Sequence, residues 1–127
     1  MMTVLKILLL MILAHVIDDF VFQPICLSKL KQKEWWEKNA PDKMYADDYI
    51  AALTIHSVSW SIMTLLPIIF FTQAPDGFIM TMFIFNAVTH AVIDDAKANR
   101  KEINLGKDQR IHLIQIVMTW ILYTMTV

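Results

Sequence analysis

The feature that most constrains this chain is a run of 27 residues without a formal charge, between Asp48 and Asp76. A helix needs about 20 consecutive, predominantly apolar residues to cross a bilayer, so this run is long enough. Pro67 lies inside it and predicts a kink, which neighbouring helices tolerate in a membrane. The whole chain is 57% hydrophobic and 18% charged, with a mean hydropathy of +0.49. We therefore predict a helical membrane protein.

Three further segments are predicted to cross the membrane. Residues 77–93 and 111–127 are uncharged runs of 17 residues each, which is the lower limit for a span. The first segment is the weakest, because only residues 7–17 lie between Lys6 and Asp18, and a span requires the helix to carry Asp18 and Asp19 to its end. A length of 127 residues fits one small domain. The expected fold is all-α: a membrane-embedded antiparallel four-helix bundle forming one domain over residues 1–127, with helices at about 2–23, 48–73, 77–97 and 108–127.

A cleavable signal peptide is the alternative interpretation of residues 1–23, because a basic residue followed by an apolar run has that outline. The run continues into His15, Asp18 and Asp19 without a cleavage site of the small-x-small type. We therefore favour a membrane helix.

The basic residues indicate the orientation of the helices. Ten of the 11 Lys and Arg residues lie in two segments, 24–48 and 95–110, and none lies in the connection at 73–77. Cytoplasmic loops carry an excess of Lys and Arg, so these two segments are predicted to lie inside. Both termini are then periplasmic, in a bacterial inner membrane. Trp35 and Trp36, among Lys and Glu in the first segment, are typical of an amphipathic helix at the lipid interface. A solvated linker is the alternative.

Charge and cysteine content exclude several other classes of protein. A formal net charge of -1 argues against a nucleic-acid partner, which requires a basic face. Cys26 is the chain's single cysteine. An intramolecular disulfide, a CxxC redox pair and a cysteine zinc knuckle are therefore excluded.

Each of the four predicted helices contains one of the chain's four histidines, and three histidines have an aspartate one helical turn away on the same face. The order of His and Asp along the chain reverses with the direction in which the helix crosses the membrane. The two helices that run toward the cytoplasm read His then Asp, and the last helix reads Asp then His. In each pair the histidine is therefore the deeper residue. The pairs are His15 with Asp19, His90 with Asp94 and His112 with Asp108, while His56 has Ala52 at the matching position.

Ionisable groups at membrane depth are costly unless they find partners inside the bundle, so they indicate a functional site. Four imidazoles and three carboxylates suit one or two divalent metals, namely zinc, manganese or iron. Asp18 and Asp95 point about 100° away from their neighbours on an ideal helix and are predicted to be charges at the cytoplasmic interface. The alternative is that the histidines only form hydrogen bonds between helices. The predicted metal ligands are His15, Asp19, His56, His90, Asp94, Asp108 and His112.

Three ordered motifs carry a family resemblance: HxxxDFxxQ from His15, HxxIDxxK from His90 and DQxxH from Asp108. With His56 between them, the chain resembles a family of small bacterial and phage membrane proteins catalogued as a domain of unknown function. It is also distantly similar to the bacterial membrane-bound metal-dependent hydrolases. The likeness covers nearly the whole chain and implies a protein that is phage-encoded or bacterial. The implied site residues are His15, Asp19, Gln23, His56, His90, Asp94, Lys97, Asp108, Gln109 and His112, with Gln23 and Gln109 as hydrogen-bond partners of the ligands.

The leading functional hypothesis is a metal-dependent hydrolase that acts on a phosphate- or ester-containing substrate at the cytoplasmic leaflet. A bound metal lowers the pKa of a water molecule and polarises a phosphoryl or acyl oxygen. Asp94 or Asp108 is the expected general base. Lys97 or Arg110 is expected to hold an anionic head group, so a lipid or a lipid-linked phosphate is the expected substrate class, with a soluble nucleotide as the alternative.

Two other functions remain open at this point. The same ring of His and Asp would suit a metal or proton conductor that is not an enzyme. A phage or bacterial protein that interacts with the cell envelope would use the metal only to hold the helices together. Four short helices leave little interior, so a homodimer is a further expectation.

Overall fold

The structure is a computed structural model that describes residues 4–23 and 25–126. It is all-α, without a strand among these residues. Two short helical turns, η1 and η2, accompany the α-helices. The elements in chain order are α1 (Val4–Ile17), η1 (Asp18–Phe22), α2 (Ile25–Leu30), α3 (Lys33–Asn39), η2 (Lys43–Tyr45), α4 (Asp48–Phe71), α5 (Asp76–Ala98) and α6 (Leu105–Thr124).

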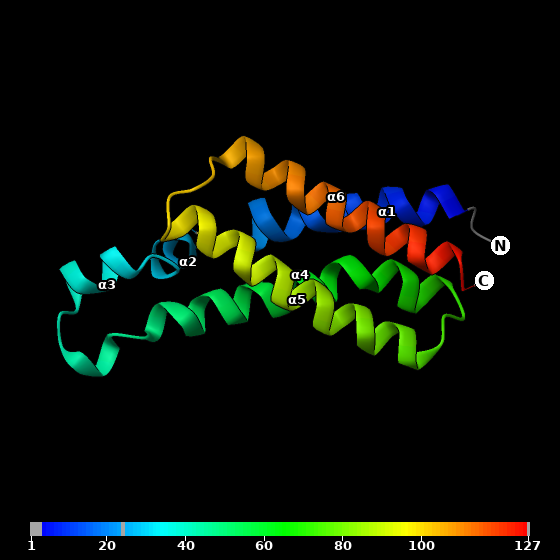
Figure 1. Cartoon of the computed structure of the whole chain (residues 1–127). Coiled ribbons are helices and arrows are strands. Elements are labelled where there is room, and N and C mark those ends of the chain that lie inside the picture. Colours follow the sequence, from blue (N-terminus) through cyan, green and yellow to red (C-terminus); the bar gives the residue numbers. More distant parts are fainter. Residues whose placement is uncertain (1–3, 24, 127) are drawn as a thin grey trace.

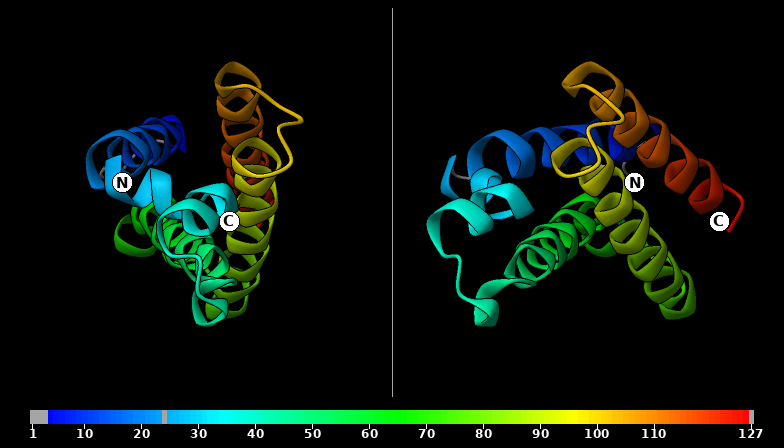
Figure 2. Two further views of the ribbon diagram at one scale, coloured as in Figure 1. Left: turned by 90° about the vertical axis from the view of Figure 1, so that its left-hand side faces the viewer. Right: turned by 60° about the vertical axis from the view of Figure 1, so that its left-hand side comes forward.

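Four long helices, α1, α4, α5 and α6, make up the body of the molecule (Figure 1). Helix α4 packs against α1 and α5, and α6 also packs against α1 and α5. The start of α1, the end of α6 and the α4–α5 connection lie at one end in Figure 1. Helices α2 and α3 lie at the other end, where Figure 2 shows them in front of the long helices. The two Lys- and Arg-rich segments are therefore at the same end of the molecule.

The helix ends follow local capping chemistry. Helix α6 begins three residues before the predicted start at Asp108, because the Asn104 side chain accepts a hydrogen bond of 2.9 Å from the Lys107 backbone N–H. Helix α4 begins at Asp48, as predicted, and ends at Phe71, two residues before the predicted end. The predicted start of the first helix at residue 2 and the predicted end of the last at residue 127 lie outside the described residues.

The end of the first long helix differs from the prediction. Helix α1 passes into η1, a π-helical turn, in which hydrogen bonds run from residue i to i+5. This wider turn separates successive side chains by a smaller angle than an α-helix does. Asp18 is therefore turned inward beside Asp19 and is only 1% exposed. The prediction that Asp18 is an interface charge is wrong, whereas the Asp95 side chain is 33% exposed and pairs with Arg100.

The segment predicted to form one interfacial helix forms two short helices, α2 and α3, with a break at Lys31 and Gln32. The break is fixed by Asn99, at the end of α5. Its amide nitrogen donates to the Lys31 carbonyl at 3.1 Å, and its oxygen accepts from the Lys33 backbone N–H at 2.7 Å. A continuous helix would have to give up both hydrogen bonds.

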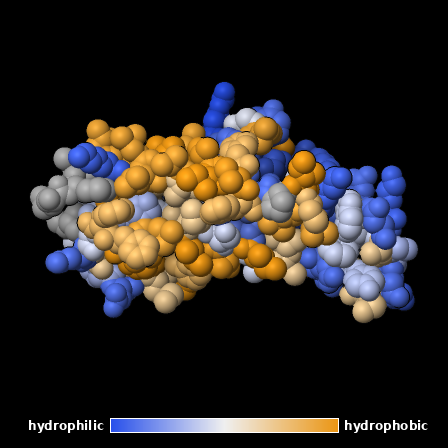
Figure 3. Space-filling view, turned by 180° about the vertical axis from the view of Figure 1, so that it is seen from behind, coloured by the Kyte–Doolittle hydropathy of each residue, from blue (hydrophilic) through white to orange (hydrophobic). Residues whose placement is uncertain are grey.

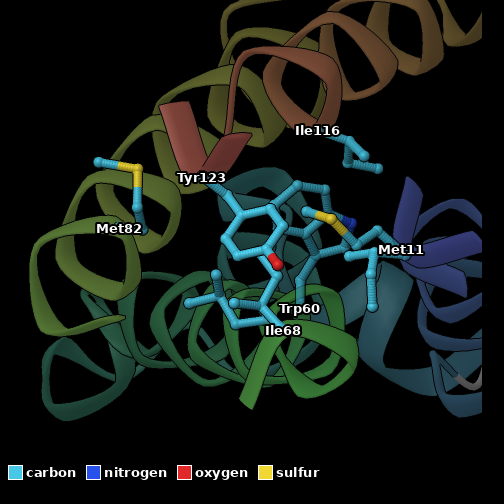
Figure 4. Packing of buried hydrophobic residues seen from close by; sticks show 8 residues of the cluster. Met11, Trp60, Ile68, Met82, Ile116 and Tyr123 are labelled. Atoms are coloured by element: carbon cyan, nitrogen blue, oxygen red, sulfur yellow. The ribbon is translucent and has the colours of Figure 1, made fainter. Parts of the chain in front are cut away.

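The interior has an apolar part and a polar part, and the apolar part is a cluster that all four long helices share (Figure 4). Trp60 is its largest fully buried side chain. Beyond Trp60 toward the end that carries α2 and α3, many of the buried side chains are ionisable, among them Asp18, His56 and Asp94. The apolar cluster consists of Ile7, Met11, Trp60, Leu65, Ile68, Met82, Ile116 and Tyr123.

The outer surface of the long helices is apolar, although part of the interior is polar. This is the reverse of the usual distribution in a soluble domain. Leu9, Ile62, Val88 and Ile114 are all exposed, one on each long helix. On the face seen in Figure 3, hydrophobic surface covers much of the long helices, and the largest hydrophilic area lies at the end that carries α2 and α3. Among the described residues, two helical stretches are long and apolar enough to span a membrane by length and composition, Lys43–Phe71 and Asp76–Ala98.

Replacing Asn104 with Ala should lower the free energy of unfolding by about 1 kcal/mol, because the first turn of α6 loses its side-chain cap. Asn104→Asp keeps a capping oxygen and should remain close to the parent protein. Unfolding of the detergent-solubilised chain, followed by circular dichroism, measures the difference. Equal stability of the two variants would show that the Asn104 cap does not stabilise α6.

Candidate metal centre

Ionisable side chains from α1, η1, α4, α5 and α6 converge on one buried cluster, which we call the metal centre because its His and Asp side chains could hold a metal ion. Three of the imidazoles surround the Trp60 indole, with ring centroids at 4.3 Å for His90, 5.6 Å for His112 and 5.7 Å for His15. The His56 ring lies 5.0 Å from that of His90. The predicted residues that the structure brings together there are His15, Asp19, Gln23, His56, His90, Asp94, Lys97, Asp108, Gln109 and His112.

His90 is at the middle of the metal centre. Its ring stacks on that of Trp60 and on that of His112, at centroid distances of 4.3 Å and 4.0 Å. The residue is 0% exposed, and neither ring nitrogen has a hydrogen-bond partner. Buried polar atoms in proteins normally have such partners, because an unsatisfied one costs about 1–3 kcal/mol. A metal ligand, in contrast, presents a buried nitrogen that no protein group uses.

His56 lies among three carboxylates. Its Nε2 atom is 3.5 Å from Asp19 Oδ1 and 3.5 Å from Asp94 Oδ2, and its Nδ1 atom is 3.6 Å from Asp18 Oδ2. These distances exceed the usual 2.9–3.0 Å of an N–H···O hydrogen bond. Two atoms bound to one tetrahedral zinc at 2.0–2.1 Å are about 3.3–3.4 Å apart. The spacing therefore fits ligands of a common ion, and the aspartates of η1 supply the carboxylate that the sequence lacks at Ala52.

His112 shows the same pattern. Its Nε2 atom is 3.3 Å from Asp94 Oδ1 and 3.4 Å from Asp108 Oδ1. One ring nitrogen carries at most one proton and can donate to one of these oxygens only. Asp108 Oδ1 is buried and has no hydrogen-bond partner. The arrangement again fits two oxygens and a nitrogen that share a cation.

His15 differs from the other three histidines, because both of its ring nitrogens have protein partners. Trp60 Nε1, which can only donate, donates to His15 Nδ1 at 2.8 Å. The proton is then on Nε2, which lies 3.2 Å from Gln109 Oε1. Gln109 donates in turn to Asp19 Oδ2 at 3.0 Å. His15 and Gln109 thus orient Asp19, and direct metal binding by His15 stays a prediction.

Two lysines balance part of the negative charge. Lys31 is buried, and its ammonium group donates to Asp94 Oδ2 at 2.5 Å and to Gln23 Oε1 at 2.7 Å. Lys97 donates to Asp108 Oδ2 at 2.6 Å. The four carboxylates, on Asp18, Asp19, Asp94 and Asp108, against two ammonium groups leave a formal charge of −2 with neutral histidines. A buried excess of negative charge favours a cation.

Three residues of the centre were missed from the sequence. Trp60 lies one turn after His56, so the helical spacing used for the aspartates would also have found it. Asp18 depends on the π-helical turn, and Lys31 lies in a lysine-rich segment without a pattern that separates it from its neighbours. Arg110, predicted as an alternative to Lys97, is exposed on α6.

The residues fit a divalent cation with nitrogen and oxygen ligands. Among the described residues, two groups of three have ligand atoms within 4.8 Å of one another: Asp19 with His56 and His90, and His90 with Asp94 and His112. Imidazole and carboxylate together suit zinc, manganese or iron.

Comparison with known proteins identifies the family. Residues 7–127 match a family described as protein of unknown function (DUF3307). The chain belongs to the DUF3307 family. The matched region contains every residue of the metal centre. No curated protein and no solved structure matches the chain.

Replacing His90 or Asp94 with Ala in this DUF3307 protein should weaken binding of a divalent metal by more than the roughly 10- to 100-fold that loss of an outer hydrogen-bond partner causes. The matched control is Asp95→Asn, since Asp95 is adjacent but half-exposed. Isothermal titration with zinc measures the affinity, and circular dichroism checks helicity. An equal loss in all three variants would point to a general effect of charge or folding.

Proposed function

We propose that this DUF3307 protein is a membrane-embedded, metal-dependent hydrolase that acts on a phosphate- or ester-containing substrate at the cytoplasmic leaflet. The observation that carries the proposal is His90, whose buried ring nitrogens lack protein hydrogen-bond partners and which belongs to both groups of potential metal ligands. The distant resemblance of the chain to the bacterial membrane-bound metal-dependent hydrolases agrees with this assignment.

The membrane arrangement rests on an apolar exterior over an ionisable interior. In a bilayer, ionisable residues face the interior of a helix bundle and pair with one another, as they do in this protein. We propose that α1, α4, α5 and α6 cross the bacterial inner membrane as an antiparallel bundle. Among the described residues, α4 and α5 meet the length and hydropathy expected of a span. The basic segments at the end that carries α2 and α3 favour a cytoplasmic location for that end and periplasmic termini.

The chain offers the parts that hydrolysis requires. Asp19, His56 and His90 would hold a divalent cation, with Asp94 next to them. When bound, such a cation lowers the pKa of water and polarises a phosphoryl or acyl oxygen. Asp108 is suited to accept the proton of the attacking water, because its Oδ1 atom is free of hydrogen bonds.

Lys97 and Asp18 would support this chemistry. Lys97 fixes Asp108 through its other carboxylate oxygen, and its side chain is 27% exposed, so its ammonium group is within reach of an anionic substrate. Asp18 lies beside His56 Nδ1, and its position favours the tautomer in which Nε2 is free to bind metal. The end that carries α2 and α3 is also where head groups would lie, so a lipid or a lipid-linked phosphate is the substrate class that we propose.

The purified protein, loaded in turn with zinc, manganese and iron, should hydrolyse phosphomonoesters, phosphodiesters or carboxylic esters presented in mixed micelles. Asp108→Asn should lower kcat by about 10²- to 10⁴-fold, because the proton acceptor is lost. Chelation should abolish turnover, and Asp95→Asn should retain it. Protein that binds metal and hydrolyses none of these substrates would refute the hydrolase.

Cys26 provides a test of the orientation, because it is exposed on α2 and is the chain's single cysteine. A membrane-impermeant maleimide should label it in inside-out vesicles and not in intact spheroplasts. Cys26→Ser is the control for background labelling. Labelling in spheroplasts would place α2 on the periplasmic side and reverse the proposed topology.

A metal or proton conductor is the second candidate, and a ladder of buried polar residues favours it. Asn86 is one turn from His90, and its side chain accepts from Gln115 at 3.0 Å and from Thr119 at 3.1 Å. Buried hydroxyl and amide groups thus continue from the metal centre toward the other end of the molecule. Ion or proton flux into protein-containing vesicles, with Asn86→Leu as the blocked variant, would distinguish a conductor from an enzyme.

A further inference from the structure

We infer that the metal centre binds two divalent cations and that the Asp94 carboxylate bridges them. The inference rests on the metal binding that the proposed function requires, and not on catalysis. It also narrows the substrate class to phosphate esters.

The two oxygens of Asp94 face two different groups of ligands. Oδ2 is 3.5 Å from His56 Nε2 and 3.8 Å from His90 Nε2. Oδ1 is 3.3 Å from His112 Nε2. A carboxylate that presents one oxygen to each of two histidine groups has the geometry of a bridging ligand.

The first cation would be held by Asp19, His56 and His90. Their ligand atoms lie within 4.8 Å of one another, and the Asp19 Oδ1 atom is buried without a hydrogen-bond partner. Asp94 Oδ2 then completes four ligands, which is the number in common tetrahedral sites. Lys31 remains next to this oxygen as its outer hydrogen-bond donor.

The second cation would be held by His112, Asp94 and Asp108. His90 also belongs to the group that contains Asp94 and His112, but a neutral imidazole has a single lone pair and binds one ion. Asp108 Oδ1 takes its place, at 3.4 Å from His112 Nε2 and free of hydrogen bonds. With two ions bound, Asp108 is therefore a ligand, in place of the proton acceptor that it would be with a single ion. The separations of 3.3 Å and 3.4 Å match the roughly 3.3–3.4 Å between ligands of one tetrahedral ion.

The net charge of the metal centre indicates which class of substrate would suit two bound ions. The centre has a formal charge of −2 from four carboxylates and two lysines, so one divalent cation neutralises it. Two cations leave an excess of positive charge that a phosphate dianion would balance and a neutral carboxylic ester would not. Pairs of ions about 3.5–4 Å apart are used by phosphatases and nucleases to hold the attacking and leaving oxygens.

Counting bound ions tests the inference directly. The full chain in detergent is dialysed against excess Mn²⁺, then against buffer, and analysed for metal and protein. We expect two ions per chain in the parent protein and in Asp95→Asn, and one ion per chain in His56→Ala and in His112→Ala. One ion per chain in the parent protein would overturn the inference.

A second measurement uses the parent protein alone, so its result does not depend on whether the variants fold. Two Mn²⁺ ions joined by a carboxylate are magnetically coupled, so electron paramagnetic resonance should show a coupled spectrum at saturation. The six-line spectrum of isolated Mn²⁺ at saturation would overturn the bridge.

The outcomes separate this inference from the proposed function. Two coupled ions without turnover of any ester would support the two-ion centre and refute the hydrolase. One ion with phosphate ester hydrolysis would do the reverse. No bound metal would overturn both.

Discussion

Asp94 is the group on which the packing of the helices depends. It lies on α5 and contacts His56 of α4, His112 of α6 and Lys31 between α2 and α3. A buried carboxylate without partners costs several kcal/mol, so the helices that supply these partners must meet at its level. Deeper in the bundle, Trp60 also connects several helices. Its indole ring stacks on His90, and its N–H group donates a hydrogen bond to His15.

The sequence predicted the residues of the centre where helical periodicity applies. His15, His90 and His112 each have an aspartate at four residues' distance, and the interior carries all three pairs. The long helices likewise follow from uncharged runs. Periodicity does not determine where a helix widens, so Asp18 was assigned to the wrong face. Periodicity also does not indicate which lysine of a basic segment points inward. For Lys31 the backbone is held by a hydrogen bond from Asn99, which is 68 residues away in the sequence.

A polar interior and an apolar exterior are both expected of a helix bundle that is surrounded by lipid. In water, a domain of this size would have to hide its apolar surface, and its core would consist of the side chains that this protein exposes. In the proposed membrane arrangement lipid covers the apolar exterior, and hydrogen bonds and ion pairs between the helices add to the packing of the apolar cluster. The family description of the DUF3307 chain names no reaction, so the chemistry of this interior is the basis for assigning one.

The hydrogen bond of 2.6 Å from Ser59 to Asp18 has a consequence for biosynthesis. Both residues belong to the first half of the chain, and so does His56, which also faces Asp18. The second half has its own pair in Asp108 and His112. On the proposed membrane topology, each half would enter the bilayer as a helical hairpin that already pairs a carboxylate, so Asp18 would not remain unpaired in the lipid until α5 and α6 are synthesised.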